Sequence, residues 1–169
     1  MKTPTGNTTD QAPADPAASD DALATQPIGY WSGLAHEAVT RHLRDAMARI
    51  DVTQPQYWVL NRVNGGAGAP VREEVAAQLT PLADGPHEIA RVVDQLLHRG
   101  WLHADEDGRL RLTGEGEAAR VRLRALVTEQ RAVVHEGIDD AEYVTALKVL
   151  RRMAANVEAA RTATDPQAG

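Results

Sequence analysis

The side chains best suited to reading nucleic-acid bases lie on the polar face of a helix predicted over residues 86–99. Its apolar residues, at 89, 92, 93, 96 and 97, have the spacing of one buried helical stripe, so the opposite face is left to water or to a partner. Arg91 stands about one turn into this helix, where a guanidinium can make a bidentate contact to guanine. The alternative is an exposed arginine that pairs with Glu88 or Asp94. Secondary candidates on the same face are His87, Glu88 and Gln95.

Three further arginines are candidates for holding DNA phosphates. Arg109 and Arg111 alternate with leucines in a predicted strand, so both side chains point to one face. They either bind phosphates or keep an edge strand from pairing with another chain. Arg72, in a shorter amphipathic helix predicted over residues 70–79, is the third candidate.

Aromatic side chains are concentrated in two segments, near residues 30 and 57, and hold four of the six aromatic residues of the chain. With His36 and His42 nearby, they could line a pocket in which an aromatic effector stacks. Packing in an ordinary hydrophobic core is the other interpretation. The predicted effector-binding residues are Tyr30, Trp31, His36, Tyr57 and Trp58.

No set of residues predicts a metal site, a cofactor or a catalytic centre. Cysteine is absent, which excludes thiolate ligands and disulfides, and His98 and His103 offer no compact ligand set. The sequence has no Gly-rich phosphate loop, HExxH motif or serine elbow. We therefore expect no enzyme activity, although a pocket could still do chemistry with His36 and Glu37.

Helix, turn, helix and hairpin follow one another in the centre of the chain. After the helices at 70–79 and 86–99, two runs of alternating apolar residues flank Asp105-Glu106-Asp107-Gly108, and an Asp-Gly between such runs is a hairpin signal. This order predicts a winged helix-turn-helix domain over residues 51–113. Such a domain usually places its second helix in the major groove of DNA.

Long helices are predicted on both sides of this domain, over residues 27–50, from 114 to about 136, and from about 141 to 160. Their apolar bands are wider than one chain can cover. A second copy would cover them, so we predict a two-fold homodimer held by residues 27–50 and 114–160. The predicted fold class is mainly α (α+β), a winged helix-turn-helix with a helical dimerisation region.

Helix boundaries carry recognisable signals. Thr53 with Gln56, and Asp139 with Glu142, have the spacing of capping boxes, and Thr113 is a predicted N-cap. Pro86 suits a first helical turn that Asp84 or Gly85 would cap, while Gly100 is a normal residue just past a helix end. Gly137 is predicted to separate the last two helices, and glycines 65, 66 and 68 to form a turn.

Composition sets the remaining expectations. Residues 1–26 are rich in Pro, Thr, Ala and Asp and predict a disordered tail, and residues 161–169 predict a frayed one. There is no bilayer-spanning apolar run and no signal-peptide pattern, so we expect a cytoplasmic protein. The net charge is −6, and residues 71–113 carry five arginines against eight acidic residues, a net charge of −3. This balance opposes DNA binding, because phosphate contacts usually supply much of the affinity.

Three segments together resemble the MarR family of bacterial transcriptional regulators, over about residues 28–157. Residues 52–60, VTQPQYWVL, match the family's LTxxQxxVL; residues 93–102 match its VDxLxxxGLV through Val93-Asp94-Gln95-Leu96 and Arg99-Gly100-Trp101-Leu102. Residues 112–116, LTGEG, match its LTxxG. The wing is shorter than is typical of the family, and acidic where the family carries an Asp-Arg-Arg run. The loop at residues 80–85 is longer than usual.

The resemblance implies a homodimer joined through the first and the last two helices, with the helix from Pro86 reading pseudo-palindromic double-stranded DNA and the wings reaching the minor groove. It also implies a small phenolic or aromatic effector bound between the dimer helices, in residues 27–50 and 114–160, and the winged helix-turn-helix of residues 51–113, which we call the reading domain. The expected function is that of a repressor released by such an effector. The acidic reading region favours the alternative, a relative without DNA affinity that works as a ligand-binding protein or a repurposed enzyme.

Overall fold

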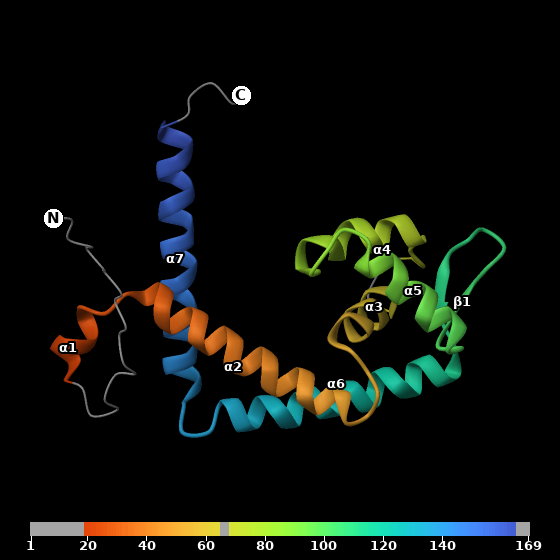
Figure 1. Cartoon of the computed structure of the whole chain (residues 1–169), viewed down its shortest axis with the longest axis horizontal. Coiled ribbons are helices and arrows are strands. Elements are labelled where there is room, and N and C mark those ends of the chain that lie inside the picture. The colour runs from red at the N-terminus through yellow and green to blue at the C-terminus, as the bar shows by residue number, and fades with distance from the viewer. Residues whose placement is uncertain (1–18, 65–67, 165–169) are drawn as a thin grey trace, which may run out of the picture. The chain divides into compact units, whose positions relative to one another are not determined.

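The computed structural model describes residues 19–64 and 68–164 (Figure 1). The chain divides into two compact units, the first ending at Ala38 and the second beginning at Val39. The first unit contains helix α1 (Asp20–Ala24) and the beginning of α2 (Ile28–Ala48). Most of the predicted disordered tail, residues 1–18, lies outside the described residues. Its last part was predicted wrongly, because α1 is helical: the Ser19 hydroxyl accepts the Ala22 N–H, and two aspartates stand at the positive end of the helix.

The second unit contains the end of α2 and all later elements, in an order that confirms a mainly helical fold with a winged helix-turn-helix. The elements after α2 are α3 (Gln54–Asn64), α4 (Arg72–Leu79), a 3-10 turn η1 (Thr80–Leu82), α5 (Glu88–His98), β1 (Leu102–Ala104), β2 (Leu110–Leu112), α6 (Gly114–Val134) and α7 (Asp140–Thr164).

The predicted caps are confirmed where they rest on side chains three residues apart. Thr53 N–H donates to Gln56 Oε1 at 3.1 Å, and Gln56 N–H donates to Thr53 Oγ1 at 3.4 Å. The reciprocal pair of Asp139 and Glu142 closes in the same way, at 3.1 and 2.8 Å. Thr113 accepts the N–H of Gly116. These bonds satisfy N–H groups that have no partner within the first turn of a helix.

The second helix of the helix-turn-helix begins at Glu88 and not at Pro86. Pro86 and His87 form a turn, and neither Asp84 nor Gly85 caps the helix; the Glu88 carboxylate reaches back to accept the Asp84 N–H at 2.8 Å. The end was predicted correctly, because Gly100 has φ +73° and Trp101 N–H donates to the carbonyl of Leu96.

The wing is a short antiparallel hairpin. Leu102 pairs with Leu112, and Ala104 pairs with Leu110. Gly108 closes the turn at φ +73°, as the predicted Asp-Gly turn requires. Leu102 and Leu110 are buried, so the apolar side of the hairpin belongs to the core.

One hydrophobic core fills the second unit and fixes the positions of α3 to α6 and of the hairpin. Its apolar side chains come from each of these elements, and those with almost no exposed surface are Met47, Val59, Leu60, Val75, Ile89, Val93, Leu96, Leu110 and Leu123. Gly116 permits the closest approach, because a Cβ there would lie 1.9 Å from the carbonyl oxygen of Trp101. The start of α6 is thereby held against the beginning of β1.

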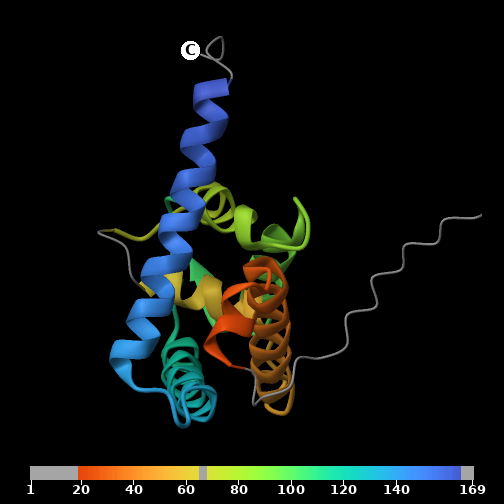
Figure 2. The same cartoon turned by 90° about the vertical axis from the view of Figure 1, so that its left-hand side faces the viewer.

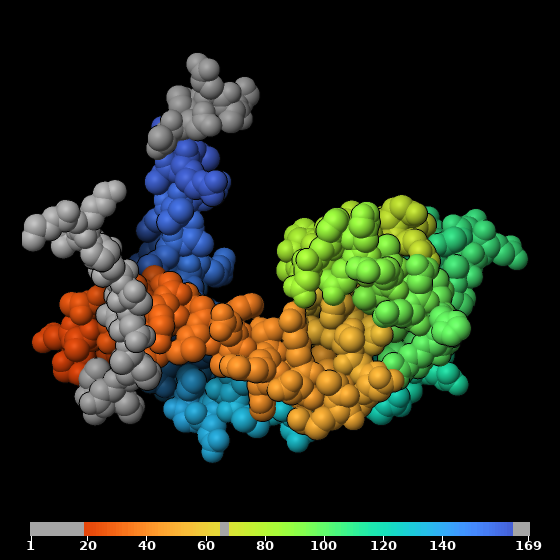
Figure 3. Space-filling model, in the orientation of Figure 1, coloured from red at the N-terminus to blue at the C-terminus, as the bar shows by residue number. Residues whose placement is uncertain are grey.

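Helix α7 is the exception to this burial. It turns away from α6 after Gly137, which has φ +74° (Figure 2), and stands apart from α3, α4 and α5 (Figures 1 and 3). Among residues 140–163 only Tyr143 is partly covered. The helix continues to Thr164, beyond the predicted start of fraying at 161, as its alanine-rich end permits. Residues 165–169 and the predicted turn at Gly65 and Gly66 lie outside the described residues. None of the described helices is long and apolar enough to cross a membrane.

Candidate nucleic-acid interface

Arg91 projects from α5 as an exposed arginine. Both acidic neighbours that could have paired with it are engaged elsewhere: Asp94 with Arg72, and Glu88 with the Asp84 N–H. Within the described part of the chain, no hydrogen bond or ion pair involves the Arg91 guanidinium. A free guanidinium on the exposed face of the second helix can make two parallel hydrogen bonds to a guanine edge.

The other predicted residues of this face differ in how exposed their side chains are and in whether they are hydrogen-bonded. His87 is exposed at the start of α5, and Glu88 is half-buried at the helix entry. The Gln95 amide oxygen accepts a hydrogen bond from Gln56 Nε2 at 3.3 Å. Gln95 is therefore attached to α3, and its amide would have to keep or exchange that bond in order to contact a base.

Arg72 is held by an ion pair that joins α4 to α5. Its Nη2 atom lies 2.5 Å from Asp94 Oδ1. The hydrogen bond from Arg72 lowers the pKa of the Asp94 carboxyl below its ordinary value, and the same bond raises the pKa of Arg72. The pair links α4 to α5 at the surface, and it leaves less positive charge for a phosphate.

Asp105 organises the wing and engages both wing arginines. Its Oδ1 accepts the backbone N–H of Arg109 at 2.9 Å and that of Asp107 at 3.2 Å, while its Oδ2 accepts Arg111 Nε at 3.0 Å. The bond from the Arg109 N–H, followed by that from Arg111, lowers the pKa of the Asp105 carboxyl. The Arg109 side chain donates to the Ala69 carbonyl at 2.8 Å. Asp105 is therefore a structural residue, and Glu106 and Asp107 are the exposed acids of the tip.

The five aromatic and histidine residues predicted to bind an effector are not brought together within either unit. Tyr30, Trp31 and His36 belong to the first unit, where the Trp31 indole donates to the Gln26 amide oxygen. Tyr57 and Trp58 belong to the second unit and pack, partly buried, against its core. Within this unit, Tyr57 and Trp58 therefore pack at an ordinary hydrophobic core, which was the alternative to a role in an effector pocket.

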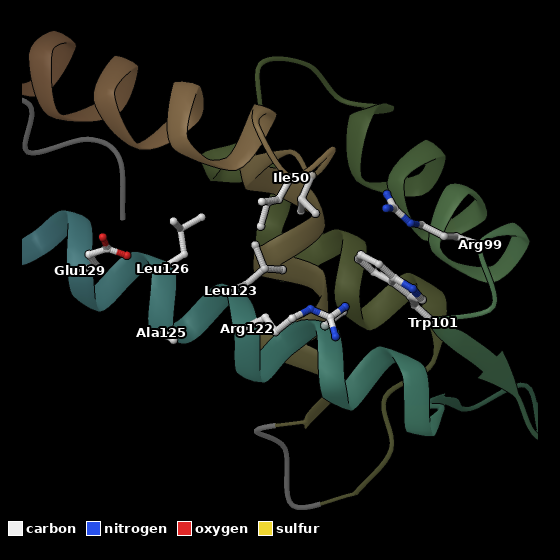
Figure 4. Close-up of a pocket in the computed structure, with 10 residues that line it drawn as sticks. Ile50, Arg99, Trp101, Arg122, Leu123, Ala125, Leu126 and Glu129 are labelled. Carbon is white, nitrogen blue, oxygen red and sulfur yellow. The ribbon is translucent and has the colours of Figure 1, made fainter.

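A different cavity lies between α6 and the end of the reading domain (Figure 4). It has a volume of about 420 Å³, and we call it the Trp101 cavity. Its walls are Ile50, Val52, Arg99, Trp101, Ala119, Arg122, Leu123, Ala125, Leu126 and Glu129.

The Trp101 cavity combines an aromatic wall with two cations. Arg99 lies over the Trp101 ring at 4.0 Å from its centroid, and it also donates to the Asp51 carbonyl at 2.7 Å. Arg122 points toward Trp101 from α6 (Figure 4). The sequence analysis missed this site, and the only signal was the short separation of Arg99 and Trp101. No group of His, Cys, Asp and Glu among residues 19–64 and 68–164 is arranged to hold a metal ion.

Comparisons with known proteins identify the fold through structure. No family model matches the sequence, and no curated protein matches it. The PcaV transcriptional regulator of Streptomyces coelicolor superposes with a TM-score of 0.64 at 26% identity, over 79% of this chain and 99% of its own. A MarR family protein of Mycobacterium tuberculosis, solved in complex with DNA, gives 0.62 at 18% identity, over 76% and 98%. The reduced form of MarR from E. coli gives 0.60 at 20% identity, over 79% and 98%.

Proposed function

We propose that this chain, a MarR-type winged-helix protein, is a homodimeric DNA-binding repressor that a small aromatic effector releases from its operator. The observation that carries the proposal is the exposed face of α5, on which Arg91 is free while its acidic neighbours are engaged. The solved DNA complex of a protein with the same fold supports it. In this function α5 enters the major groove, and Arg91 reads a guanine.

A dimer follows from the apolar side chains that α7 leaves in water. Leu147 is 42% exposed and Leu150 is 38% exposed, Val157 continues the same stripe, and the exposed side chains of Val144 and Met153 lie on either side of it. A second copy of the chain would bury this stripe, most simply through a two-fold interface. Two copies of α5 would then face half-sites about one helical turn apart, so the operator is a pseudo-palindrome.

The charges of the reading region set the expected strength of binding. Arg72 and Arg111 are paired with aspartates, and Arg109 is bonded to a backbone carbonyl, so few cations are free for phosphates. Because salt dependence reflects the number of phosphate contacts, we expect modest affinity with a shallow dependence on salt concentration.

The test is fluorescence anisotropy of the full chain at low salt, with its own upstream region and a random duplex of equal length. Arg91→Ala should cost about 1–3 kcal/mol on the upstream duplex and much less on the random one. Arg124→Ala, which removes an exposed arginine of α6, is the matched control. Equal and negligible binding to both duplexes would refute a DNA-binding function.

The Trp101 cavity is our candidate for the effector site. It joins Arg99 and Trp101, at the end of α5, to α6, so a ligand seated there can alter how α5 is held. An aromatic effector would stack on Trp101, and Arg122 would pair with an acidic substituent. An effector must weaken DNA binding by wild-type protein and fail to do so with Arg122→Gln. No effect of any aromatic acid on DNA binding would contradict this assignment.

A second candidate function is supported by the net charge of −3 over residues 71–113 and by the engagement of four of its five arginines. In this alternative the fold binds a ligand, or acts as a repurposed enzyme, without binding DNA. The anisotropy experiment separates the two, because only the repressor distinguishes the upstream duplex from the random one.

A further inference from the structure

The buried amide of Gln56 connects the start of α3 to the exposed face of α5. Gln56 is 8% exposed, its Oε1 accepts the backbone N–H of Thr53 at 3.1 Å, and its Nε2 donates to Gln95 Oε1 at 3.3 Å. Gln95 is exposed and lies four residues after Arg91, a spacing that makes two side chains neighbours on a helix. The two glutamines therefore join the capping box of α3 to the side of α5 that carries Arg91, and we call them the glutamine relay.

The orientation of both amides follows from one backbone N–H group. A backbone N–H can only donate, so the Gln56 atom that faces Thr53 must be its oxygen. The NH2 group of Gln56 then faces Gln95 and can only donate, so the Gln95 atom that faces it must also be an oxygen. Turning either amide over would bring two donors together. The backbone of Thr53 thus determines the polarity of both side chains.

Two other helices in the described chain begin with a glutamate where α3 has a glutamine. Glu74 and Glu142 each accept the N–H of the residue three positions before them, at 3.1 Å, and both are exposed. A carboxylate at position 56 would accept a backbone N–H equally well, but it would have no hydrogen to donate to Gln95. The amide at this position is therefore what determines which end of Gln95 is held.

The other end of Gln95 determines what it can recognise. Its Nε2 makes no hydrogen bond within residues 19–64 and 68–164, so two N–H donors remain on an exposed side chain. A glutamine with both amide atoms available pairs with adenine, donating to N7 and accepting from N6. Guanine instead presents two acceptors, N7 and O6, in the major groove. A glutamine held by its oxygen matches guanine, and it leaves the N6 donor of adenine without an acceptor.

We propose that Gln56 is a positioning residue for base recognition: it holds Gln95 by its oxygen and thereby makes Gln95 a donor that selects guanine over adenine. The inference rests on the proposed DNA-binding function, because it requires α5 to lie in the major groove. Gln56 acts through Gln95 and does not itself touch DNA. Each half-site then contains a guanine for Gln95 as well as one for Arg91.

The experiment is fluorescence anisotropy of the full chain on its upstream duplex and on versions with one base pair changed in both half-sites. The Gln95 position is the base pair that affects binding by wild-type protein and not by Gln95→Ala. There, wild-type protein should bind guanine about 5- to 100-fold more tightly than adenine, the range of one good base contact. Gln56→Glu should invert this preference, because the carboxylate accepts from Gln95 Nε2 and turns the Gln95 oxygen toward the base.

Thr53→Ala is the matched control, because it weakens the same cap without disturbing the relay. It removes the hydroxyl that accepts the Gln56 N–H at 3.4 Å and keeps the backbone N–H that orients Gln56. It should lower the melting temperature and leave the ratio of guanine to adenine affinity unchanged. Gln56→Met, which holds Gln95 by neither end, should abolish the preference. Circular dichroism would verify that each variant is folded.

Exchange of the side-chain amide hydrogens, measured by NMR on the free protein, tests the relay without DNA. The Gln56 NH2 should exchange slowly because it is buried and bonded, and the Gln95 NH2 should exchange as fast as an exposed amide. In Gln56→Glu the Gln95 NH2 should become protected, because it now donates to the carboxylate.

Four results would overturn the proposal, and they distinguish its failure from that of the repressor function. Sequence-specific binding with a guanine preference that survives Gln56→Glu and Gln56→Met would show that Gln56 does not orient Gln95. Base preferences unchanged by Gln95→Ala would show that Gln95 reads no base. A protected Gln95 NH2 in the free wild-type protein would show the opposite amide orientation. All three leave the repressor function intact, whereas equal and negligible binding to the upstream and random duplexes would overturn both.

Discussion

Helices α5 and α7 both carry an apolar stripe at helical spacing, and only the stripe of α5 is covered within the chain. Ile89, Val92, Val93 and Leu96 of α5 are at most 5% exposed. The corresponding stripe of α7, with Leu147 and Leu150 near its centre, faces water. Fully burying one such side chain stabilises a protein by about 1.5–3 kcal/mol. The stability of α5 is therefore a property of one chain, whereas α7 requires a partner to gain the same contribution.

The two helices also differ in what a polar residue does beside the stripe. On α5, Asp94 is bound to Arg72 of α4 and Gln95 to Gln56 of α3, so the polar residues help to hold the motif together. Arg91 has no such partner among the described residues, which makes it the best candidate for contacting a DNA base. On α7 the first turn is fixed by its own capping box, and Tyr143 is the point of attachment to α6 through Arg131 and His135.

The largest expected difference is in the free energy of unfolding, between variants that each remove one leucine from one of the two stripes. Leu96→Ala should lower the free energy of unfolding by about 2–5 kcal/mol, because it leaves a cavity in the core. Leu150→Ala should lower it only through the dimer, so that its effect depends on protein concentration. Urea unfolding at two concentrations a hundredfold apart measures both. A concentration-independent loss of equal size in the two variants would contradict the comparison.

Gly116→Ala tests the close packing that ties α6 to the reading domain. Alanine normally stabilises a helix relative to glycine, but here its Cβ would collide with the Trp101 carbonyl oxygen. We expect a loss of about 1–3 kcal/mol, the usual cost of overpacking, in thermal denaturation. Gly114→Ala is the control, because a Cβ at Gly114 meets nothing within 4 Å. If the two variants were equally stable, α6 would not be fixed against β1 in this way.

Substitutions at the acidic wing tip should have a smaller effect, on the affinity for DNA. Asp105 should respond differently from Glu106 and Asp107. Glu106→Gln with Asp107→Asn removes two exposed charges and should tighten binding to any duplex by about 0.2–1 kcal/mol, the range of exposed charge interactions. Asp105→Asn should not tighten binding in the same way, because Asp105 holds the turn and Arg111. Anisotropy titrations on the random duplex measure both variants. Equal tightening by Asp105→Asn would show that its bonds do not shape the wing.

The smallest expected effect is the dependence of the wing on pH. The pKa of the Asp105 carboxyl is lowered in the folded protein, chiefly by the bond from the Arg109 N–H. Its contribution to stability is therefore complete above the ordinary carboxyl pKa and is lost as the pH falls through the lowered value. Hydrogen exchange at the Arg109 amide, corrected for the intrinsic rate, should lose protection over that acidic interval. The Asp105→Asn variant should lack this loss; if it shows the same acid dependence, another group is responsible.

The sequence determined the elements whose signals are local. The capping boxes at Thr53 and Asp139, the N-cap at Thr113 and the hairpin turn at Gly108 each depend on residues a few positions apart. The apolar periodicity of α5 likewise specified which face is buried. The start of α5 was predicted two residues too early, because residues 86 and 87 form a turn, and the Glu88 carboxylate accepts the Asp84 N–H.

Only the tertiary structure decided which candidate arginine is free. Arg72 meets Asp94 across 22 positions of sequence, and Arg109 meets the Ala69 carbonyl across 40. Neither pairing has a local signal, because each depends on how two packed elements bring distant atoms within hydrogen-bond distance. The same holds for the Trp101 cavity, whose walls come from α6 and from the residues that follow α2 and α5, and for the contact of Gly116 with Trp101. Helical spacing specifies which face of an element is buried, whereas the packing of the whole chain determines what that face meets.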